Sequence, residues 1–407
     1  MPRATSYSFP ALVAASAVIY YFSNPDPGHY YDYTFRVAKN LLNGSIGFAQ
    51  KPPVWLNEFV SFDGKWYSVF PLGSVLSMLP FALLASAGII GNMPSAAIAA
   101  IVAGIAVHYL LRTAATYELG ERRTVLMSLG ILFGTWAWAN ITIGGAWQIA
   151  LGFALVGQLG AIYYTAIDRR PLIAGAFFAL AFGNRTEILP TAPIFMYLLY
   201  RRRYVSPAGE NKERDAMLTD TVKPLARFCS IPFGLGIATL GYNYVRFGSI
   251  ADFGYARIPG VLDEPWYSNG IFSPTYIPRQ VWEMLFKPWE IRDAFPYLAP
   301  DAFSSSILII SPFLLFALRS GARDAVLKRC AWIAIAVITL VLWSHGNSGG
   351  WQFGYRYFIV CLPWLFLITL ENSPHRISRL ERAAYVWAFL ANTYATWLFN
   401  WTNYMRP

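Results

Sequence analysis

The residues best suited to chemistry begin in a polar stretch that follows the first apolar segment. His29, Asp32, Arg36 and Lys39 recur there at i, i+3, i+7 and i+10. This spacing predicts that they share one face of an α-helix. A carboxylate on such a face could take a proton from an attacking hydroxyl group. Asp32 is therefore a candidate general base, and Asp26 is the nearest alternative acid.

The opposite face of this predicted helix is apolar. It carries Tyr31, Phe35, Ala38 and Leu42, and the helix should end at Asn43-Gly44. A helix with these two faces lies in the plane of a membrane. It would hold Asp32 where a lipid-borne molecule meets one that arrives from water. The alternative is that Asp32 pairs with Arg36 on a solvated face.

Three further charged residues stand inside or beside apolar segments. Arg185 and Glu187 lie in GNRTEILP, and Arg356 lies in GGWQFGYRYFIV. Ionisable groups at membrane depth are costly and commonly functional. A guanidinium group offers a bidentate fork to a phosphate, so both arginines are candidate phosphate ligands. The alternatives are a structural Arg185–Glu187 pair and an Arg356 side chain that reaches the interface.

The composition defines the elements that must position these residues. Of the 407 residues, 56% are hydrophobic and only 13% are charged, which is typical of a polytopic membrane protein. The net charge of +10 comes from arginines and lysines in short breaks between apolar runs. This is the positive-inside pattern, so we expect no nucleic-acid partner. The three cysteines have no ligand-like spacing.

The apolar runs and basic breaks predict an all-α protein of about eleven membrane-spanning helices. If the N-terminus is cytoplasmic and every apolar run crosses the membrane, the later basic breaks fall on the outer side instead of the cytoplasmic side. We therefore expect the run 69–90, which contains Pro71 and Pro80, to be re-entrant or interfacial. The first outer loop then covers 24–92. The other predicted spans are 7–23, 93–111, 124–141, 148–167, a two-helix hairpin within 170–201 that turns at Gly183-Asn184-Arg185, 225–246, 302–318, 330–344, 355–371 and 383–402.

This layout divides the chain into a core of 1–246, a second outer loop of 247–301, and C-terminal helices in 302–407. The second loop is rich in aromatic residues: Trp266, Tyr267, Phe272, Tyr276, Trp282, Trp289 and Tyr297. Two interpretations stay open for them, an interfacial aromatic belt or a surface that stacks on sugars. Acidic residues also concentrate in the two outer loops, so we expect an extracytoplasmic active site.

Several segments resemble the C-type (GT-C) superfamily of membrane glycosyltransferases, in its bacterial branch of protein-mannosyltransferase and aminoarabinose-transferase relatives. The resemblance rests on the acid before LLNG at 41–44, on DGKWYSVFPLGSVLSMLPF at 63–81, and on GNRTEILPTAP, YNYVRFGSIADFGY and GGWQFGYRYFIVCLPW. It implies transfer of a sugar from a polyprenyl-phosphate donor to an acceptor at the outer face of the cell (inner) membrane.

On this resemblance, Asp32 or Asp26 is the base, while Arg185 and Arg356 bind the donor phosphate, with Glu187, His29 and Arg36 beside them. Many relatives carry an acidic pair where this chain has Tyr30-Tyr31, and a further acid where it has ITIGGAWQ. No metal ligands are assigned and no cofactor is certain, although a divalent cation, magnesium or manganese, is possible. Membrane lipids are expected partners, and the oligomeric state is left open.

Two other classes of protein stay open. A transporter or lipid flippase would use Arg185 and Glu187 as a substrate or proton site. A structural membrane subunit with a degenerate active site would account for the missing acids.

Overall fold

The computed structural model describes residues 8–204 and 214–405, and it is mostly helical. Within these residues, four helices are long and apolar enough to cross a membrane, or five if one bent pair counts as a single span. They are Ser95–Ala115, Ala146–Ile167, Val222–Phe247 and Ala325–Ser344, with the pair Glu121–Phe133 and Ala137–Ile143. The predicted helical membrane protein is confirmed at this level.

The elements follow one another along the chain without a large sheet. The helices are α1 (Ser8–Tyr21), α2 (Tyr33–Leu42), α3 (Leu72–Ser77), α4 (Leu79–Ser86), α5 (Ser95–Ala115), α6 (Glu121–Phe133), α7 (Ala137–Ile143), α8 (Ala146–Ile162), α9 (Pro171–Asn184), α10 (Ala192–Tyr204), α11 (Arg214–Phe247), α12 (Ile277–Val281), α13 (Ile307–Ile310), α14 (Ala325–Ser344), α15 (Leu362–Glu371) and α16 (Arg379–Trp401). Short 3₁₀ helices include η2 (Thr186–Thr191), η8 (Pro312–Leu318) and η9 (Arg356–Cys361). The strands are β1 (Phe59–Phe62), β2 (Lys65–Ser68), β3 (Glu290–Ile291) and β4 (Leu298–Ala299).

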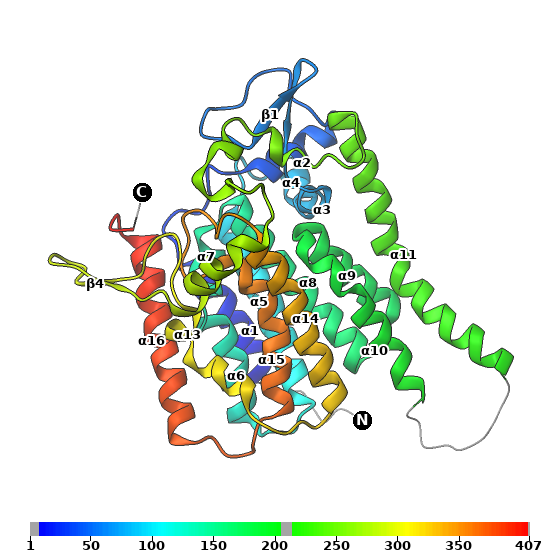
Figure 1. Cartoon of the computed structure of the whole chain (residues 1–407), viewed down its shortest axis with the longest axis vertical. Helices are drawn as coiled ribbons and strands as arrows, with labels where there is room; N and C mark the ends of the chain where they lie inside the picture. Colours follow the sequence, from blue (N-terminus) through cyan, green and yellow to red (C-terminus); the bar gives the residue numbers. More distant parts are fainter. Residues whose placement is uncertain (1–7, 205–213, 406–407) are drawn as a thin grey trace.

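The long helices form a bundle around α8 (Figure 1). Helix α8 packs against α5 and α9, while α11 packs along α9 at the edge of the bundle. In the span that begins with α8, 89% of the most apolar window is buried, against 11% in α11. Helix α8 is therefore the centre of the core, and α11 presents most of its apolar surface to the surroundings of the protein.

The first outer loop gathers at one end of the bundle, which we call the loop end (Figure 1). It contains α2, α3, α4 and the antiparallel hairpin β1–β2. The all-α prediction missed this hairpin and the small pair β3–β4. The β1–β2 turn is Asp63-Gly64, and both residues have positive φ, 47° and 73°. Asp-Gly between alternating residues is a strong hairpin signal, so this hairpin could have been predicted.

The predicted interruption of 69–90 is confirmed, because this run forms the short helices α3 and α4 rather than one long helix. Pro71 precedes α3, and Pro80 lies in the first turn of α4. Helix α3 contacts the end of α9, where a Cβ atom added to Gly73 would lie 2.4 Å from the backbone of Gly183. The Asn184 side chain donates to Ser77 Oγ at 2.8 Å. The first loop is thereby fixed to the tip of the predicted hairpin.

Helix α2 begins later than the sequence pattern suggested. It starts at Tyr33, so Asp32 is its N-cap residue and His29 precedes it. This corrects the prediction that both belong to the helix face, and the Asp32 side chain makes no capping hydrogen bond there. The predicted end is confirmed, with Gly44 at φ 75° after the C-cap Asn43. The apolar side of α2 packs on α3 and α4.

The predicted span 302–318 is not one helix. The four-residue helix α13 is separated by Ser311 from the 3₁₀ helix η8, which begins at Pro312. Proline lacks the N–H that a continuous helix needs. Ser306 caps α13 by accepting from the backbone N–H of Ile309, and its hydroxyl donates to the Leu285 carbonyl at 2.5 Å. The span 124–141 also differs, since α6 and α7 meet at a 48° bend.

Candidate functional site

Arg185 and Glu187 lie at the tip of the α9–α10 hairpin, as predicted. Helix α9 ends at Asn184, and the extended Arg185 starts the 3₁₀ helix η2. The guanidinium group contacts Glu187 Oε1 through Nε at 2.8 Å and Nη2 at 2.7 Å. The Arg185 side chain is 17% exposed and that of Glu187 is 10% exposed. The tip therefore presents a largely buried ion pair.

Arg356 stands at the start of a second 3₁₀ helix, η9, which leads into α15. Its Nη1 donates to the Trp351 carbonyl at 3.4 Å and its Nη2 to the Tyr357 hydroxyl at 3.5 Å. The Nε atom is buried without a hydrogen-bond partner among the described residues. This guanidinium group is therefore weakly satisfied.

The Tyr357 ring brings the two arginines together. The Arg185 Cζ atom lies 4.7 Å from the centre of this ring, and the Arg356 Cζ atom lies 5.2 Å from it. Both distances are within the range of cation–π contacts. Two positive groups from distant parts of the chain thus share one aromatic neighbour, an arrangement that attracts an anion.

Glu58 approaches this region from the first outer loop, immediately before β1. Trp147, in the first turn of α8, donates its indole N–H to both Glu58 carboxylate oxygens, at 2.9 and 3.0 Å. Burial raises the pKa of Glu58 to about 7, while the Trp147 hydrogen bond and the charge of Arg356 oppose the rise. A carboxyl group with this pKa can exchange a proton at neutral pH.

The second outer loop contributes tyrosines beside the same residues. The Tyr255 and Tyr267 hydroxyl groups are 2.8 Å apart. Both rings contact the His345 ring, which lies 6.2 Å from the Tyr357 ring between centres. Burial lowers the pKa of His345, and the charge of Arg185 lowers it further.

These groups define the loop-end cluster. Its members come from the first outer loop, the start of α8, the α9–α10 tip, the second outer loop and the segment from α14 to η9. They are Glu58, Trp147, Arg185, Glu187, Tyr255, Tyr267, His345, Arg356 and Tyr357. It combines two carboxyl groups, two guanidinium groups and several aromatic rings.

The acidic residues singled out from the sequence lie elsewhere in the loop. Asp32 Oδ1 pairs with Arg36 Nε at 2.6 Å, as one sequence interpretation expected. Burial raises the pKa of Asp32 despite this pair. Asp26 is exposed, and its backbone N–H donates to Asn24 Oδ1 at 2.9 Å. In the described part of the chain, Asp32 is thus paired with Arg36 and not with Arg185 or Arg356.

His29 lies beside the turn between α7 and α8. Its Nδ1 accepts from the backbone N–H of Tyr31 at 3.1 Å, and its ring stacks on Tyr30. Burial lowers the pKa of His29 to about 4, with the charge of Asp26 opposing this shift. His29 is therefore a neutral group at neutral pH, which suits a role in shaping the loop.

Sequence reasoning missed Glu58 and Trp147 as site residues. They are 89 positions apart, and no spacing rule connects a loop acid to the start of a distant helix. A signal for Trp147 existed, since GGAWQ places a large aromatic residue at a helix start after two glycines. Glu58 stood only among several loop acids.

The aromatic residues of the second outer loop divide into two groups. Tyr267 and Tyr276 are buried, and their hydroxyl groups bond within the loop. Phe272, Trp282 and Tyr297 are exposed. The interfacial belt and the sugar-stacking surface both stay open for the exposed group.

The acidic side chains of the loop-end cluster are engaged by other residues of the chain. Within residues 8–204 and 214–405, no three His, Cys, Asp or Glu side chains come together as metal ligands would. Both Glu58 oxygens accept from Trp147, and Glu187 is engaged by Arg185.

Comparisons of the chain with family models, curated proteins and solved structures found no match. The fold and the loop-end cluster therefore define a class: a helical protein with membrane-length apolar helices and a mixed acidic, basic and aromatic cluster at one end.

Proposed function

We propose that the chain is a membrane glycosyltransferase of GT-C type. It moves a sugar from a polyprenyl-phosphate donor to an acceptor on the outer face of the cell (inner) membrane. The proposal includes about eleven membrane crossings, a cytoplasmic N-terminus and an extracytoplasmic loop end. A lipid-linked donor suits a protein of this build, because its tail stays in hydrocarbon while its sugar reaches water.

One observation carries the proposal: the buried Glu58 carboxyl group, whose pKa is raised to about 7, is subject to the charge of Arg356, and Arg356 shares the Tyr357 ring with Arg185. Glycosyl transfer from a lipid phosphate needs a base for the acceptor hydroxyl and positive charge for the departing phosphate. The loop-end cluster offers both kinds of group within one region. Its place at the end of apolar helices fits a substrate that is half lipid.

The reaction proceeds with inversion in one displacement. The Glu58 carboxylate accepts the proton of the acceptor hydroxyl as its oxygen forms a bond to the anomeric carbon. The bond from that carbon to the phosphate oxygen breaks, and the electron pair leaves with the polyprenyl phosphate. Arg185 and Arg356 stabilise the negative charge of this leaving group. Glu187 orients Arg185 through its bidentate ion pair.

Glu58 is a better candidate base than the acids selected from the sequence. Asp32 is held by Arg36, and Asp26 is exposed. Glu58 is the acid whose pKa responds to Arg356. Asp32 stays a sequence-based prediction, and a direct comparison of variants separates the two.

The test measures sugar transfer and release of polyprenyl phosphate from a radiolabelled donor in membranes. Glu58→Gln should reduce transfer by at least about a hundredfold, the usual contribution of a general base. Asp32→Asn is the matched comparison and should retain most of the activity. Arg185→Gln and Arg356→Gln should each reduce transfer by about tenfold or more.

Two results would contradict the proposal. Full activity in Glu58→Gln, with loss in Asp32→Asn, would assign the base to Asp32. No release of polyprenyl phosphate from any donor by the unaltered protein would remove the transferase function itself. Equal amounts of each variant in the membrane, measured by immunoblot, control for folding.

A transporter or lipid flippase is the second candidate, and one observation favours it. The largely buried Arg185–Glu187 ion pair lies between the end of α9 and the 3₁₀ helix η2, which leads into α10. Ionisable groups inside a membrane protein commonly mark substrate or proton pathways. Movement of labelled lipid across vesicles without release of polyprenyl phosphate would support this candidate. A degenerate structural subunit would give neither signal.

A further inference from the structure

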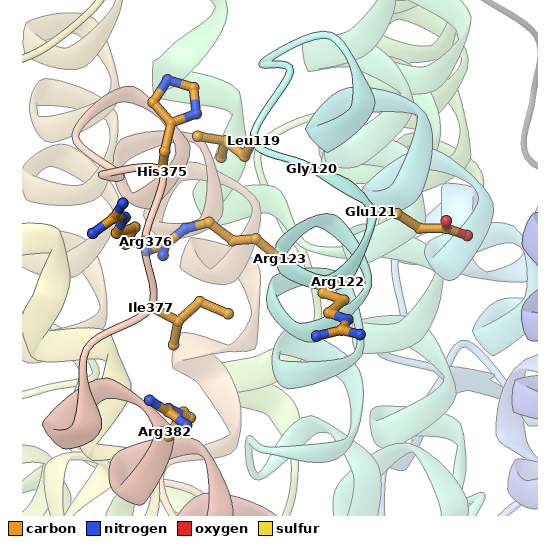
Figure 2. A pocket seen from close by; sticks show the side chains of 9 residues that line it. All are labelled: Leu119, Gly120, Glu121, Arg122, Arg123, His375, Arg376, Ile377 and Arg382. Carbon is orange, nitrogen blue, oxygen red and sulfur yellow. The ribbon is translucent and has the colours of Figure 1, made fainter.

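A second basic region lies at the end of the bundle opposite the loop end. The segment before α6 and the α15–α16 connection enclose an open pocket of about 710 Å³. Its lining is Leu119, Gly120, Glu121, Arg122, Arg123, His375, Arg376, Ile377 and Arg382 (Figure 2). These two segments are more than 250 residues apart in the chain, as the contact between Arg123 and Glu381 shows by its separation of 258.

The pocket is rich in cations that have no acidic partner among the described residues. Arg122, Arg376 and Arg382 are exposed, and among the described residues none of them forms an ion pair. His375 is exposed beside them. Among the lining residues Glu121 is the one acid, and its carboxylate accepts from Ser8 Oγ at 2.7 Å. Like charges placed this close repel one another unless an anion lies between them.

The floor of the pocket is also positive. The buried Glu381 carboxylate receives Arg123 on one oxygen and Arg319 on the other, the latter at 3.2 Å. One carboxylate thus faces two guanidinium groups. Arg123 is almost fully buried, and its Nε and Nη1 atoms have no partner among the described residues. Its side chain extends from α6 toward the segment that carries Arg376 (Figure 2).

We propose that this pocket binds the phosphate-containing headgroup of an anionic membrane lipid. Guanidinium groups recognise phosphate oxygens through paired N–H donors. The pocket lies where α6 and α16 begin, so a lipid headgroup could enter it while its chains stay along the bundle. Basic pockets between helices suit such headgroups. The proposal depends on membrane insertion and is independent of the transferase activity.

The positive-inside rule alone does not account for this arrangement. That rule requires basic residues in cytoplasmic breaks, but it does not require two distant breaks to converge around one pocket. It also leaves the unpartnered donors of buried Arg123 unexplained. A bound phosphate near the convergence of these side chains accounts for both features.

The experiment uses the full chain purified in a neutral detergent. Phosphatidylglycerol or phosphatidylcholine is added, and retained lipid is counted by native mass spectrometry while the unfolding temperature is recorded. Phosphatidylglycerol should be retained and should raise the unfolding temperature more than phosphatidylcholine does. The triple change Arg122→Gln, Arg376→Gln and Arg382→Gln should weaken its retention by about a hundredfold.

Two further variants distinguish the effect of losing the pocket from the effects of a lower net charge and of misfolding. Lys223→Gln, Arg227→Gln and Arg329→Gln together remove the same charge from exposed positions outside the pocket and should retain the lipid. Lysine at the three pocket positions keeps the charge but not the paired N–H donors, so retention should lie between that of the glutamine triple variant and that of the unaltered protein.

Three results would overturn the proposal. They are unchanged retention in the glutamine triple variant, equal loss in the outside triple variant, and displacement of the lipid by millimolar inorganic phosphate. The last result would assign the pocket to a soluble phosphate. If the glutamine triple variant does not fold, loss of phosphatidylglycerol preference in the single variant Arg376→Gln decides the question.

Discussion

Glu58 and Trp147 are a pair in which a neutral donor tunes an acid. The indole N–H stabilises the carboxylate, and burial destabilises it, with the net result that the pKa rises to about 7. Neither effect needs a second acid, so the absence of an acidic pair at Tyr30-Tyr31 does not remove the capacity for base catalysis. The protonation state of Glu58 should therefore control the rate.

Because a base must be deprotonated, transfer should increase as the pH rises through about 7 and then level off. Trp147→Phe removes the hydrogen bond that lowers the Glu58 pKa. The midpoint of its pH–rate profile should therefore move to higher pH by about one unit. The measurement is the pH–rate profile of the unaltered protein and of Trp147→Phe, recorded from about pH 5.5 to about pH 9. An unchanged midpoint would show that the ionisation of Glu58 does not control the rate of transfer.

Glu58 should also affect stability, whatever the function is. The folded-state pKa is raised from 4.5, so the protonated form is favoured in the folded protein. The contribution of protonated Glu58 to the free energy of unfolding is fully present below about pH 4.5 and is lost as the pH rises through about 7. Glu58→Gln mimics the protonated form. As the pH rises from about 5 to about 8, the stability of this variant relative to the unaltered protein should increase by on the order of 2 kcal/mol.

Unfolding temperatures in detergent at both ends of that pH range measure this gain. Glu290→Gln, at an exposed acid, is the control and should show little pH-dependent difference. An equal gain in both variants would mean that burial of Glu58 has no such effect.

The sequence identified Arg185 and Arg356 because charges stand out in apolar segments. It did not identify Glu58, because the importance of a loop acid depends on which distant residues surround it. Asp32 was selected by helical spacing, but the helix begins one residue after it, at Tyr33. Periodicity locates a helix more reliably than it locates the helix start.

At the scale of elements, the contact between α3 and α9 fixes the loop to the site. Gly73→Ala would place a methyl group 2.4 Å from the Gly183 backbone, which is far too close. We expect it to separate α3 from the α9 tip and to destabilise the protein by about 1–3 kcal/mol or more. Faster proteolysis of the first outer loop and a lower unfolding temperature would show this.

Gly91→Ala is the matched control for Gly73→Ala. A Cβ atom at Gly91 meets nothing within 4 Å, and this variant should behave like the unaltered protein. If Gly73→Ala were equally neutral, the close packing of α3 on α9 would be contradicted.

Element boundaries were predictable where one residue type decides them. Gly44 ends α2, and Pro71 and Pro80 interrupt 69–90, as the sequence indicated. The 302–318 run looked like a span because it has no charge after Asp301, yet Pro312 divides it. Hydropathy measures whether a segment tolerates lipid, and it does not report whether its backbone is continuous.

At the scale of the whole molecule, one buried ionic group joins three segments that are far apart in the chain. Arg123 of α6 and Arg319 after η8 both contact Glu381 of α16. Glu381→Gln would leave two guanidinium groups without their shared carboxylate. Breaking a buried pair in this way costs about 3–5 kcal/mol.

The unfolding temperature of Glu381→Gln should therefore fall steeply. Glu290→Gln, which removes the partner of Arg292 in an exposed pair, should change it little because surface pairs contribute about 0–1 kcal/mol. Equal effects of the two substitutions would contradict a structural role for the buried group.

The class of the whole molecule could be predicted from composition, and its detailed topology could not. Few charges and long apolar runs require membrane-length helices, four or five of which are found among the described residues. The exact set of crossings depends on shorter apolar helices such as α1 and α9. The length of these helices does not decide whether they cross a membrane. The convergence of the second outer loop on Tyr357 also requires the complete fold.

The 3₁₀ helices η2 and η9 contribute to the electrostatic potential at the loop-end cluster. Both η2 with α10 and η9 with α15 begin at this cluster, so their peptide dipoles direct the equivalent of about half a positive charge each toward it. This field belongs to the backbone and survives replacement of either arginine. An anion bound there would still experience attraction in Arg185→Gln or Arg356→Gln, which makes each arginine an addition to a potential that the main chain already supplies.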